Sequence, residues 1–395
     1  MAQVEVVRDG AVLVRDGRIA AVGPYAEVRR EAGGARVTEV DGVLFPGFVD
    51  AHTHAVFGMA RLEDHERRAL GKDYKTIAAE GGGILSSVRD TRTRTADELS
   101  DLTRRRLARL LAHGTTTVEV KSGYGLDLAT ELRQLEVIGA LAEGPPRLVP
   151  TFLGAHEVPA EYRDRRAAYV ALVIDEMLPA VVRQGIARYC DVFCEPGVFT
   201  VAEARRVLEA AGALGLGLKL HADELDGSGG AELAAELGAV SADHLAKASP
   251  AGIAALASSE TVAVLLPGTM LFLGKGDRAP ARALIDAGGA VALATDFNPG
   301  SSPGASLPLM ATLGVSQLGM RPAEAVMAIT VNGAAAAGEA GARGQIAPGF
   351  AADLALAAVR DWRELAYWYG MNLVAEVWVG GLPCHPREAA LKFLV

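Results

Sequence analysis

The sequence predicts an α/β protein: a (β/α)8 barrel of the TIM type, with a small β-sandwich domain built from both chain ends. Three observations lead to this prediction. Apolar runs alternate with amphipathic helical stretches through the middle of the chain, eight such runs can be distinguished, and short strand-like segments with turn signals lie at both ends. Because the eight runs are apolar almost throughout, they fit strands buried on both faces, as in a parallel barrel.

The predicted barrel strands are short. They cover residues 44–49, 115–120, 147–152, 189–193, 217–220, 240–242, 261–266 and 290–295. The stretch over residues 96–113 is an example of the helices that we expect between these strands. Thr95 and Glu98 form a capping box at its start, and Gly114 ends it.

Sequence patterns typical of β-strands also occur near the two ends of the chain. Residues 11–14 and 19–22 are apolar-rich and flank Asp16-Gly17, a strong hairpin-turn pair. Residues 353–357 and 375–379 follow the same pattern, and Gly380-Gly381 is typical of a turn. We therefore expect residues 1–43 and 350–395 to form one composite β domain, with residues 44–349 forming the barrel.

Composition narrows the possible partners and the compartment. The 395 residues include 39 Lys and Arg against 48 Asp and Glu, a net charge of −9, which argues against nucleic acid or an anionic membrane as partner. The three cysteines are too few and too sparse for a disulfide framework, which favours the cytoplasm. We expect neither a signal peptide nor a transmembrane helix.

The residues at the strand ends suggest chemistry, because active sites of such barrels lie at the C-terminal ends of the strands. The first barrel strand runs into Asp50-Ala51-His52-Thr53-His54. Side chains two residues apart on an extended chain point to the same side, so the two histidines can bind one metal together.

Two later strands end in further candidate ligands. Lys219-Leu220-His221 ends the fifth strand, and Ala294-Thr295-Asp296 ends the eighth. A buried carboxylate needs a partner or a metal. His52, His54, His221 and Asp296 make a set of three imidazoles and one carboxylate, which suits one Zn²⁺ or iron ion with an open position for water.

This set resembles that of the amidohydrolase superfamily, and longer motifs resemble the imidazolonepropionases of histidine degradation. The motifs that carry the resemblance are Val120-Lys121-Ser122-Gly123-Tyr124-Gly125, Phe152-Leu153-Gly154-Ala155-His156, Asp191-Val192-Phe193-Cys194-Glu195, Ser241-Ala242-Asp243-His244-Leu245 and Asp296-Phe297-Asn298-Pro299-Gly300-Ser301. They follow the order of the family from about residue 41 to residue 350.

The resemblance implies a function and a set of roles. The family hydrolyses the cyclic amide of 4-imidazolone-5-propanoate to N-formimidoyl-L-glutamate with a metal-activated water. It implies one divalent metal per subunit, Zn²⁺ or Fe²⁺/Fe³⁺, and a homodimer. It assigns the metal to His52, His54, His221 and Asp296, and substrate contacts to Arg61, Tyr124, His156, Glu224, Asn298, Gly300 and Ser301.

The chemistry of these side chains agrees with such roles. Arg61 can pair with a propionate through a bidentate, charge-assisted contact. His156 can donate to a ring oxygen or an oxyanion. The Asn298–Ser301 turn has backbone donors suited to a carboxylate.

The catalytic assignments include one open choice. We expect Glu224 to be general base and proton shuttle, with His244 as the alternative, Asp296 accepting a hydrogen bond from the attacking water, and His156 assisting. The fourth strand ends Phe193-Cys194-Glu195, without the carboxylated lysine common in dinuclear relatives, which favours a single metal. We expect Lys121 to be structural or to support the ligands.

Some features depart from the family or stay outside its site. Ala51 and Phe297 replace cysteines common beside the ligands, and Glu157 replaces a common alanine. His65, His113 and His385 are expected on the surface or in packing. Two rivals stay open: a deaminase of a purine or pyrimidine ring, which would release ammonia, and a catalytically silent barrel acting as a scaffold.

Overall fold

The fold is dominated by one eight-stranded parallel sheet, which runs in the order β4 to β11. The computed structural model describes residues 3–384, apart from the side chains of residues 74, 75 and 78. The barrel strands are β4 (Phe48–Asp50), β5 (Thr115–Lys121), β6 (Arg147–Ala155), β7 (Tyr189–Cys194), β8 (Gly217–Ala222), β9 (Ser241–His244), β10 (Val262–Leu265) and β11 (Val291–Leu293). The predicted (β/α)8 barrel is confirmed.

The first and last strands meet just beyond their C-terminal ends. His54 N–H donates to the Phe297 carbonyl (2.9 Å), and Asp296 N–H donates to the His52 carbonyl (3.1 Å). Below them, the buried Asp50 carboxylate accepts from the N–H and the hydroxyl of Thr295 (3.0 and 2.6 Å). The same contacts that close the barrel therefore bring the candidate ligands His52, His54 and Asp296 side by side.

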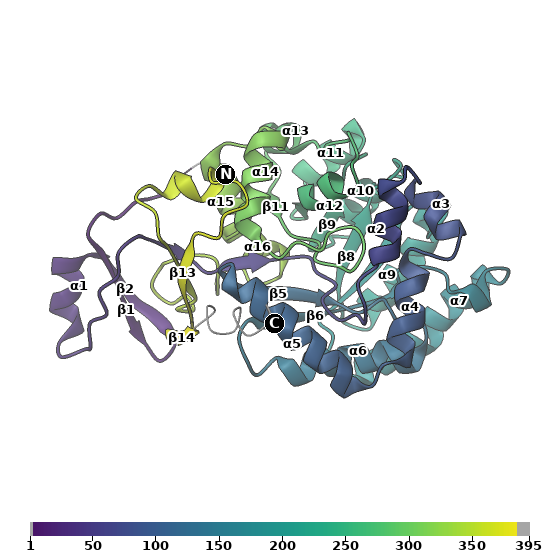
Figure 1. The fold of residues 1–395 in the computed structure, drawn as a ribbon, viewed down its shortest axis with the longest axis horizontal. Helices are drawn as coiled ribbons and strands as arrows, with labels where there is room; N and C mark the ends of the chain where they lie inside the picture. Colours follow the sequence, from purple (N-terminus) through teal and green to yellow (C-terminus); the bar gives the residue numbers. More distant parts are fainter. Residues whose placement is uncertain (1–2, 385–395) are drawn as a thin grey trace.

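Helices surround the barrel and connect its strands (Figure 1). They are α2 (Leu62–Ala69), α3 (Tyr74–Ala79), α4 (Ile84–Thr93), α5 (Ala96–Ala112), α6 (Leu128–Leu141), α7 (Arg166–Leu172), α8 (Leu178–Gln184), α9 (Val201–Ala213), α10 (Gly230–Glu236), α11 (Pro250–Ala257), α12 (Pro267–Phe272), α13 (Ala281–Asp286), α14 (Leu307–Leu318), α15 (Pro322–Ala328) and α16 (Val331–Ala336). Short 3₁₀ helices cover Ala160–Tyr162 and Trp362–Ala366, and a π-helical turn covers Val173–Met177. Among the described residues, no helix is both long and apolar enough to cross a membrane.

Local signals in the sequence set helix ends as expected. The Thr95 hydroxyl accepts from Glu98 N–H (3.2 Å), and the Glu98 carboxylate accepts from Thr95 N–H (2.9 Å), so the predicted capping box is present. Helix α5 ends at Ala112. Gly114, two residues later, has a φ of 89°, in the left-handed region that favours glycine.

Segments from the N-terminal and C-terminal parts of the chain form two small antiparallel sheets beside the barrel. One is the hairpin β1 (Gly10–Arg15) and β2 (Arg18–Pro24), which helix α1 (Tyr25–Ala32) follows. The other has the order β14-β13-β12-β3, with β3 (Val43–Pro46), β12 (Leu354–Ala357), β13 (Val374–Val379) and β14 (Leu382–Cys384). Ile19 N–H donates to the Phe350 carbonyl (2.9 Å), so N- and C-terminal segments join directly.

The predicted strand over residues 44–49 is wrong as a single strand. Residues Val43–Pro46 pair with β12 in the small sheet, whereas Phe48–Asp50 pair with β5 in the barrel. The chain changes sheets at Gly47, where a Cβ would lie 2.1 Å from the Thr116 hydroxyl oxygen. We propose Gly47 as the junction of the two domains, four residues beyond the end of the predicted segment 1–43. The predicted C-terminal part, 350–395, extends beyond the described residues.

Candidate active site

Nearly every residue assigned from the sequence lies at one cavity in the mouth of the barrel. The cavity is lined by His54, Arg61, Ile84, Tyr124, His156, Phe193, His221, Glu224, His244, Asp296, Asn298 and Ser301. Of the assigned residues, only His52 and Gly300 do not line it. Both contact residues that do, as described below.

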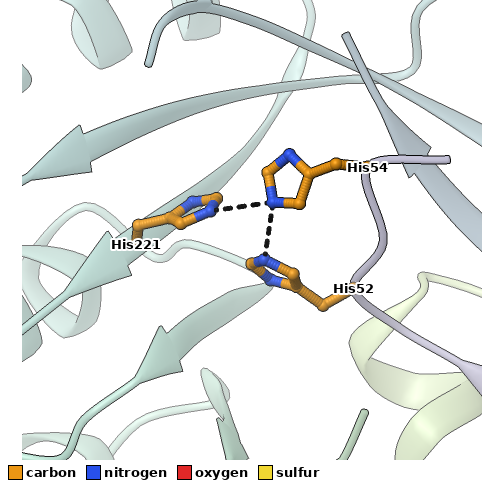
Figure 2. A group of neighbouring side chains, drawn as sticks. All are labelled: His52, His54 and His221. Atoms are coloured by element: carbon orange, nitrogen blue, oxygen red, sulfur yellow. Dashed lines mark hydrogen bonds between the residues drawn. The ribbon is translucent and has the colours of Figure 1, made fainter. Parts of the chain in front are cut away.

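Three imidazole nitrogens converge in this cavity. His54 Nε2 lies 3.2 Å from His52 Nε2 and 3.4 Å from His221 Nε2, and Figure 2 shows the three rings turned toward one another. Asp296 Oδ1 lies 3.5 Å from the Nε2 atoms of both His52 and His54. The four predicted ligands are therefore close enough to share one ion.

The opposite ring nitrogens show why these atoms face one another. His52 Nδ1 lies 2.6 Å from Asp243 Oδ2, and His221 Nδ1 lies 3.0 Å from Asp191 Oδ2. A carboxylate only accepts, so the proton of each neutral ring lies on Nδ1 and leaves the Nε2 lone pair bare. The bare Nε2 atoms of His52 and His221 both face His54 Nε2, and a carboxylate behind a histidine is a common support of metal ligands. The donor set therefore fits a divalent metal.

Burial keeps two of the ligand histidines, His52 and His54, in the neutral form that binds metals. It holds the pKa of His52 and His54 well below the ordinary value, so both rings are neutral. Burial also lowers the pKa of His221, but the Asp191 carboxylate more than offsets this and raises it overall. For Asp296, burial raises the pKa to about 6, and the Thr269 hydroxyl donates to its Oδ2 at 2.6 Å.

His244 is closer to the ligand set than the sequence indicated. His52, His244 and Asp296 form a second group whose ligand atoms all lie within 4.8 Å of one another. Because this group shares His52 and Asp296 with the first, both describe one place. His244 also faces Glu224, with Nδ1 3.7 Å from Oε2.

Glu224 is buried on a loop that follows β8. The Glu195 carboxylate, at the end of β7, accepts from the N–H groups of Glu224 (3.1 Å) and Asp226 (2.6 Å) and so fixes this loop. Burial raises the pKa of Glu224 to about 8, and the charge of Asp296 adds to the effect. A carboxyl that titrates near neutral pH suits proton transfer.

Arg61 reaches the cavity from the start of α2 and packs against the loop after β11. Its N–H donates to the Pro299 carbonyl (3.0 Å), and a Cβ on Gly300 would lie 2.0 Å from the guanidinium carbon. Arg68 donates to the Gly300 carbonyl (2.9 Å). Gly300 therefore leaves the space that Arg61 occupies.

The expected free backbone donors of this loop are not available, because Asn298 uses them. Asn298 Oδ1 accepts from the N–H groups of Gly300 and Ser301 (2.8 Å each). Its amide donates to the Asp296 carbonyl (2.7 Å) and to the Ser301 hydroxyl oxygen (2.8 Å). Asn298 thus holds the loop in shape beside the ligand Asp296.

His156 has a different hydrogen-bonding role from the one expected. Its Nδ1 lies 2.9 Å from the Gly123 carbonyl, which only accepts, so Nδ1 carries the proton. Burial lowers the pKa of His156 to about 3, so the ring is neutral and its Nε2 is an acceptor. Its ring stacks on His54, with centroids 5.1 Å apart, and Tyr124 lies 5.3 Å away. In this tautomer the ring presents an acceptor to the cavity, whereas we expected a donor from the sequence.

Two buried aspartates behind the ligands, Asp191 and Asp243, were quoted in motifs but given no role, and Lys121 was expected to be structural or to support the ligands. Asp191 and Asp243 contact ligand histidines, and the fully buried Lys121 contacts both carboxylates. The available signal was a charged residue inside an apolar strand, which is costly to bury without a partner. His65, stacked on Phe272 (5.0 Å), and His113 do not line the cavity, as expected, and His385 lies outside the described residues.

The residues that replace expected neighbours of the ligands are compatible with the site. Ala51 is fully buried, and the Phe297 carbonyl takes part in barrel closure. Burial raises the pKa of Glu157, whose carboxylate accepts from Val158 N–H (2.9 Å). None of them displaces a candidate ligand.

Fold and site together define a metal-dependent hydrolase built on a (β/α)8 barrel. Residues 43–383 match the model of the amidohydrolase family, and residues 10–35 match that of the imidazolonepropionase-like composite domain of bacteria. The imidazolonepropionase of Solibacter usitatus is 49% identical over 98% of this chain and 94% of its own length. That of Symbiobacterium thermophilum is 51% identical over 95% and 90%. The chain therefore belongs to the amidohydrolase family and, within it, to the imidazolonepropionases.

Solved structures with low sequence identity share the fold. An adenosine deaminase from Xanthomonas campestris with bound zinc has a TM-score of 0.70 at 23% identity, covering 95% of this chain and 88% of its own. The ochratoxinase of A. niger has a TM-score of 0.71 at 20% identity, covering 96% and 92%. At these identities the likeness concerns the fold alone.

Proposed function

We propose that this enzyme hydrolyses the cyclic amide of 4-imidazolone-5-propanoate to N-formimidoyl-L-glutamate in the degradation of histidine. The single observation that carries the proposal is the convergence of His52, His54, His221 and Asp296 in a cavity that also holds a guanidinium. Relatives named imidazolonepropionase, about half identical over nearly the whole chain, support the same reaction.

The metal is proposed to be one divalent ion per subunit, zinc or iron. It would be held by His52, His54, His221 and Asp296. When bound, it lowers the pKa of water to roughly 7 and polarises a carbonyl. A single ion is supported by β7, which ends in Cys194 rather than lysine, and by Lys121, whose ammonium is already surrounded by carboxylates.

Arg61 is proposed to bind the propionate of the substrate. Its Nε is buried without a hydrogen-bond partner among the described residues, and its guanidinium lies at the cavity. A bidentate pair with a carboxylate would satisfy the group and fix the ring in place. Tyr124, Gly300 and Ser301 complete this side of the proposed site, and Asn298 shapes it.

The proton is proposed to travel through Glu224. Its carboxylate accepts a proton from the attacking water and delivers it to the ring nitrogen as the amide bond breaks. His244, 3.7 Å away, is the alternative carrier. His156 would accept a hydrogen bond from a ring N–H of the substrate through its bare Nε2.

The decisive test is product identification. We expect the metal-loaded protein to convert 4-imidazolone-5-propanoate into a product heavier by one water, with loss of the imidazolone absorbance and without ammonia. A chelator should abolish the reaction, and adding the metal back should restore it. Ammonia release would favour a deaminase instead, and a metal-loaded protein without turnover would favour a silent scaffold.

The cell compartment and assembly are proposed as cytoplasm and homodimer. The support is the family resemblance and the absence of disulfides among the described cysteines, since Cys190, Cys194 and Cys384 are all free. Light scattering after gel filtration checks the dimer, which a monomer mass would contradict.

A further inference from the structure

Two lysines lie fully buried inside the barrel, and only one of them is linked to the candidate ligands. Lys121 ends β5, and its ammonium lies 2.8 Å from Glu119 Oε1, 2.8 Å from Asp191 Oδ2 and 3.5 Å from Asp243 Oδ2. All four side chains are fully buried. Lys219 in β8 donates instead to the Ser241 hydroxyl oxygen (3.2 Å) and the Ala336 carbonyl (2.7 Å).

The two aspartates that contact Lys121 also hold the ligand rings. Asp243 Oδ2 lies 2.6 Å from His52 Nδ1, and Asp191 Oδ2 lies 3.0 Å from His221 Nδ1. The other Asp191 oxygen accepts from His221 N–H (3.1 Å). A continuous chain of contacts therefore runs from His52 through Asp243, Lys121 and Asp191 to His221.

A second path links Lys121 to the segment between the paired histidines. Lys121 N–H donates to the Thr53 carbonyl (2.9 Å). The Glu119 carboxylate accepts from the Lys121 ammonium and also from the Thr53 N–H (3.4 Å). The Glu119 backbone carbonyl accepts from the Thr53 hydroxyl (2.7 Å). Lys121 and Glu119 thus fix the residue that separates His52 from His54.

We propose that Lys121 is a positioning residue, which orients His52 and His221 by holding Asp243 and Asp191 together beneath them. The inference rests on the proposed metal site. Without the ammonium, two buried carboxylates would repel each other and turn away, and the rings that they orient would follow. Supports of this kind typically change metal affinity by about 10- to 100-fold.

The alternative is that the lysine only compensates buried charge for folding, and Lys219 is the matched control. Both lysines are fully buried in barrel strands, but Lys219 does not contact a carboxylate that holds a ligand. The experiment compares Lys121→Met with Lys219→Met. It measures Zn²⁺ affinity by chelator competition and records the visible absorption of the Co²⁺-loaded proteins, which reports ligand geometry independently of turnover.

We expect Lys121→Met to weaken Zn²⁺ binding about 10- to 100-fold and to alter the Co²⁺ spectrum. Lys219→Met should keep both, whatever its effect on melting temperature. Wild-type affinity and spectrum in Lys121→Met, or equal losses in both variants, would overturn the positioning role. If Lys121→Met does not fold, Lys121→Gln takes its place, with a smaller expected loss. If neither folds while Lys219→Met does, the lysine serves the fold and the proposal is wrong.

Failure of this inference is distinct from failure of the proposed function. A wild-type protein that binds Zn²⁺ and turns over the imidazolone, beside an unaffected Lys121→Met, contradicts only the role of Lys121. A wild-type protein that binds no metal contradicts the metal site itself.

Discussion

The interior of the barrel contains two regions built from the same strands with opposite chemistry. Val49, Val149, Val262, Val264 and Ala292 belong to one buried apolar cluster, although their strands are not all neighbours in the sheet, so they meet inside the barrel. At the C-terminal ends of β4, β6, β8, β9 and β11, the cavity is lined by histidines and carboxylates instead. Burying apolar groups stabilises the fold, whereas burying charges opposes it unless they are paired. The apolar region therefore serves stability, and the mouth serves chemistry.

The largest difference between the two regions should appear when one residue is substituted in each and metal content, activity and stability are compared. His221→Ala removes a candidate ligand, so bound metal should be lost and activity should fall by about a thousandfold or more, with little change in the stability of the metal-free protein. Val264→Ala in the apolar region should destabilise the fold by about 2 kcal/mol and keep metal and kcat. Metal analysis, denaturant unfolding and kinetics check both. Full metal content in His221→Ala would contradict the assignment.

Within the mouth, Glu224→Gln should lower kcat by about 10²- to 10⁴-fold while metal content stays at the wild-type level. The amide keeps the size of the side chain but cannot accept the proton. His244→Asn is the comparison, since it removes the alternative carrier. Steady-state kinetics with metal analysis decides between them: if His244→Asn loses more kcat at full metal content, His244 is the carrier.

On the substrate side of the mouth, Arg61→Ala should raise KM by about 30- to 100-fold and change kcat little, because a charge-assisted pair with the propionate is lost. Arg104, an exposed residue of α5, provides the control: Arg104→Ala should behave as wild type. Unchanged KM in Arg61→Ala would contradict the anchor role.

Gly300→Ala tests the same contact from the opposite side, with a smaller expected effect. The added Cβ would lie 2.0 Å from the Arg61 guanidinium carbon, so the arginine must shift away, and KM should rise about tenfold. Gly304→Ala is the control, since its Cβ would meet no atom within 4 Å. Equal kinetics of the two variants would show that Arg61 binds nothing from this position.

The sequence predicts the mouth better than its support. Strand ends locate His52, His54, His221 and Asp296, because a residue that follows an apolar run must lie at the barrel mouth. Asp191 and Asp243 were visible in the strands β7 and β9, but their partners, His221 and His52, are 30 and 191 residues away. Such contacts depend on the barrel register, which strand patterns alone do not specify.

One wrong prediction and one unforeseen contact have a similar local cause. The strand over residues 44–49 looked continuous because its apolar pattern crosses Gly47, while the need for glycine there comes from the distant Thr116. His156 was expected to donate a hydrogen bond. Its tautomer depends on the Gly123 carbonyl, and the sequence does not show that this carbonyl lies beside the ring. Pattern thus predicts where a side chain lies, and long-range contacts decide what it can do.

The last comparison concerns how buried charge in the mouth opposes stability as pH changes. In the metal-free protein, burial raises the pKa of Glu224 from 4.5 to about 8, so the folded protein holds a proton that the unfolded chain releases above pH 4.5. This contribution is complete below pH 4.5 and is lost as pH rises through 8, by at most about 1.4 kcal/mol per pH unit. Glu224→Gln lacks the titration. The free energy of unfolding of the wild type should therefore fall relative to Glu224→Gln between pH 5 and pH 8 (about the interval between the two pKa values). Taking the difference cancels the contributions of His52 and His54, whose lowered pKa values act in the opposite direction below pH 6.5. Parallel stability curves from denaturant unfolding would show that Glu224 ionises freely, and that its burial in the mouth does not oppose its charge.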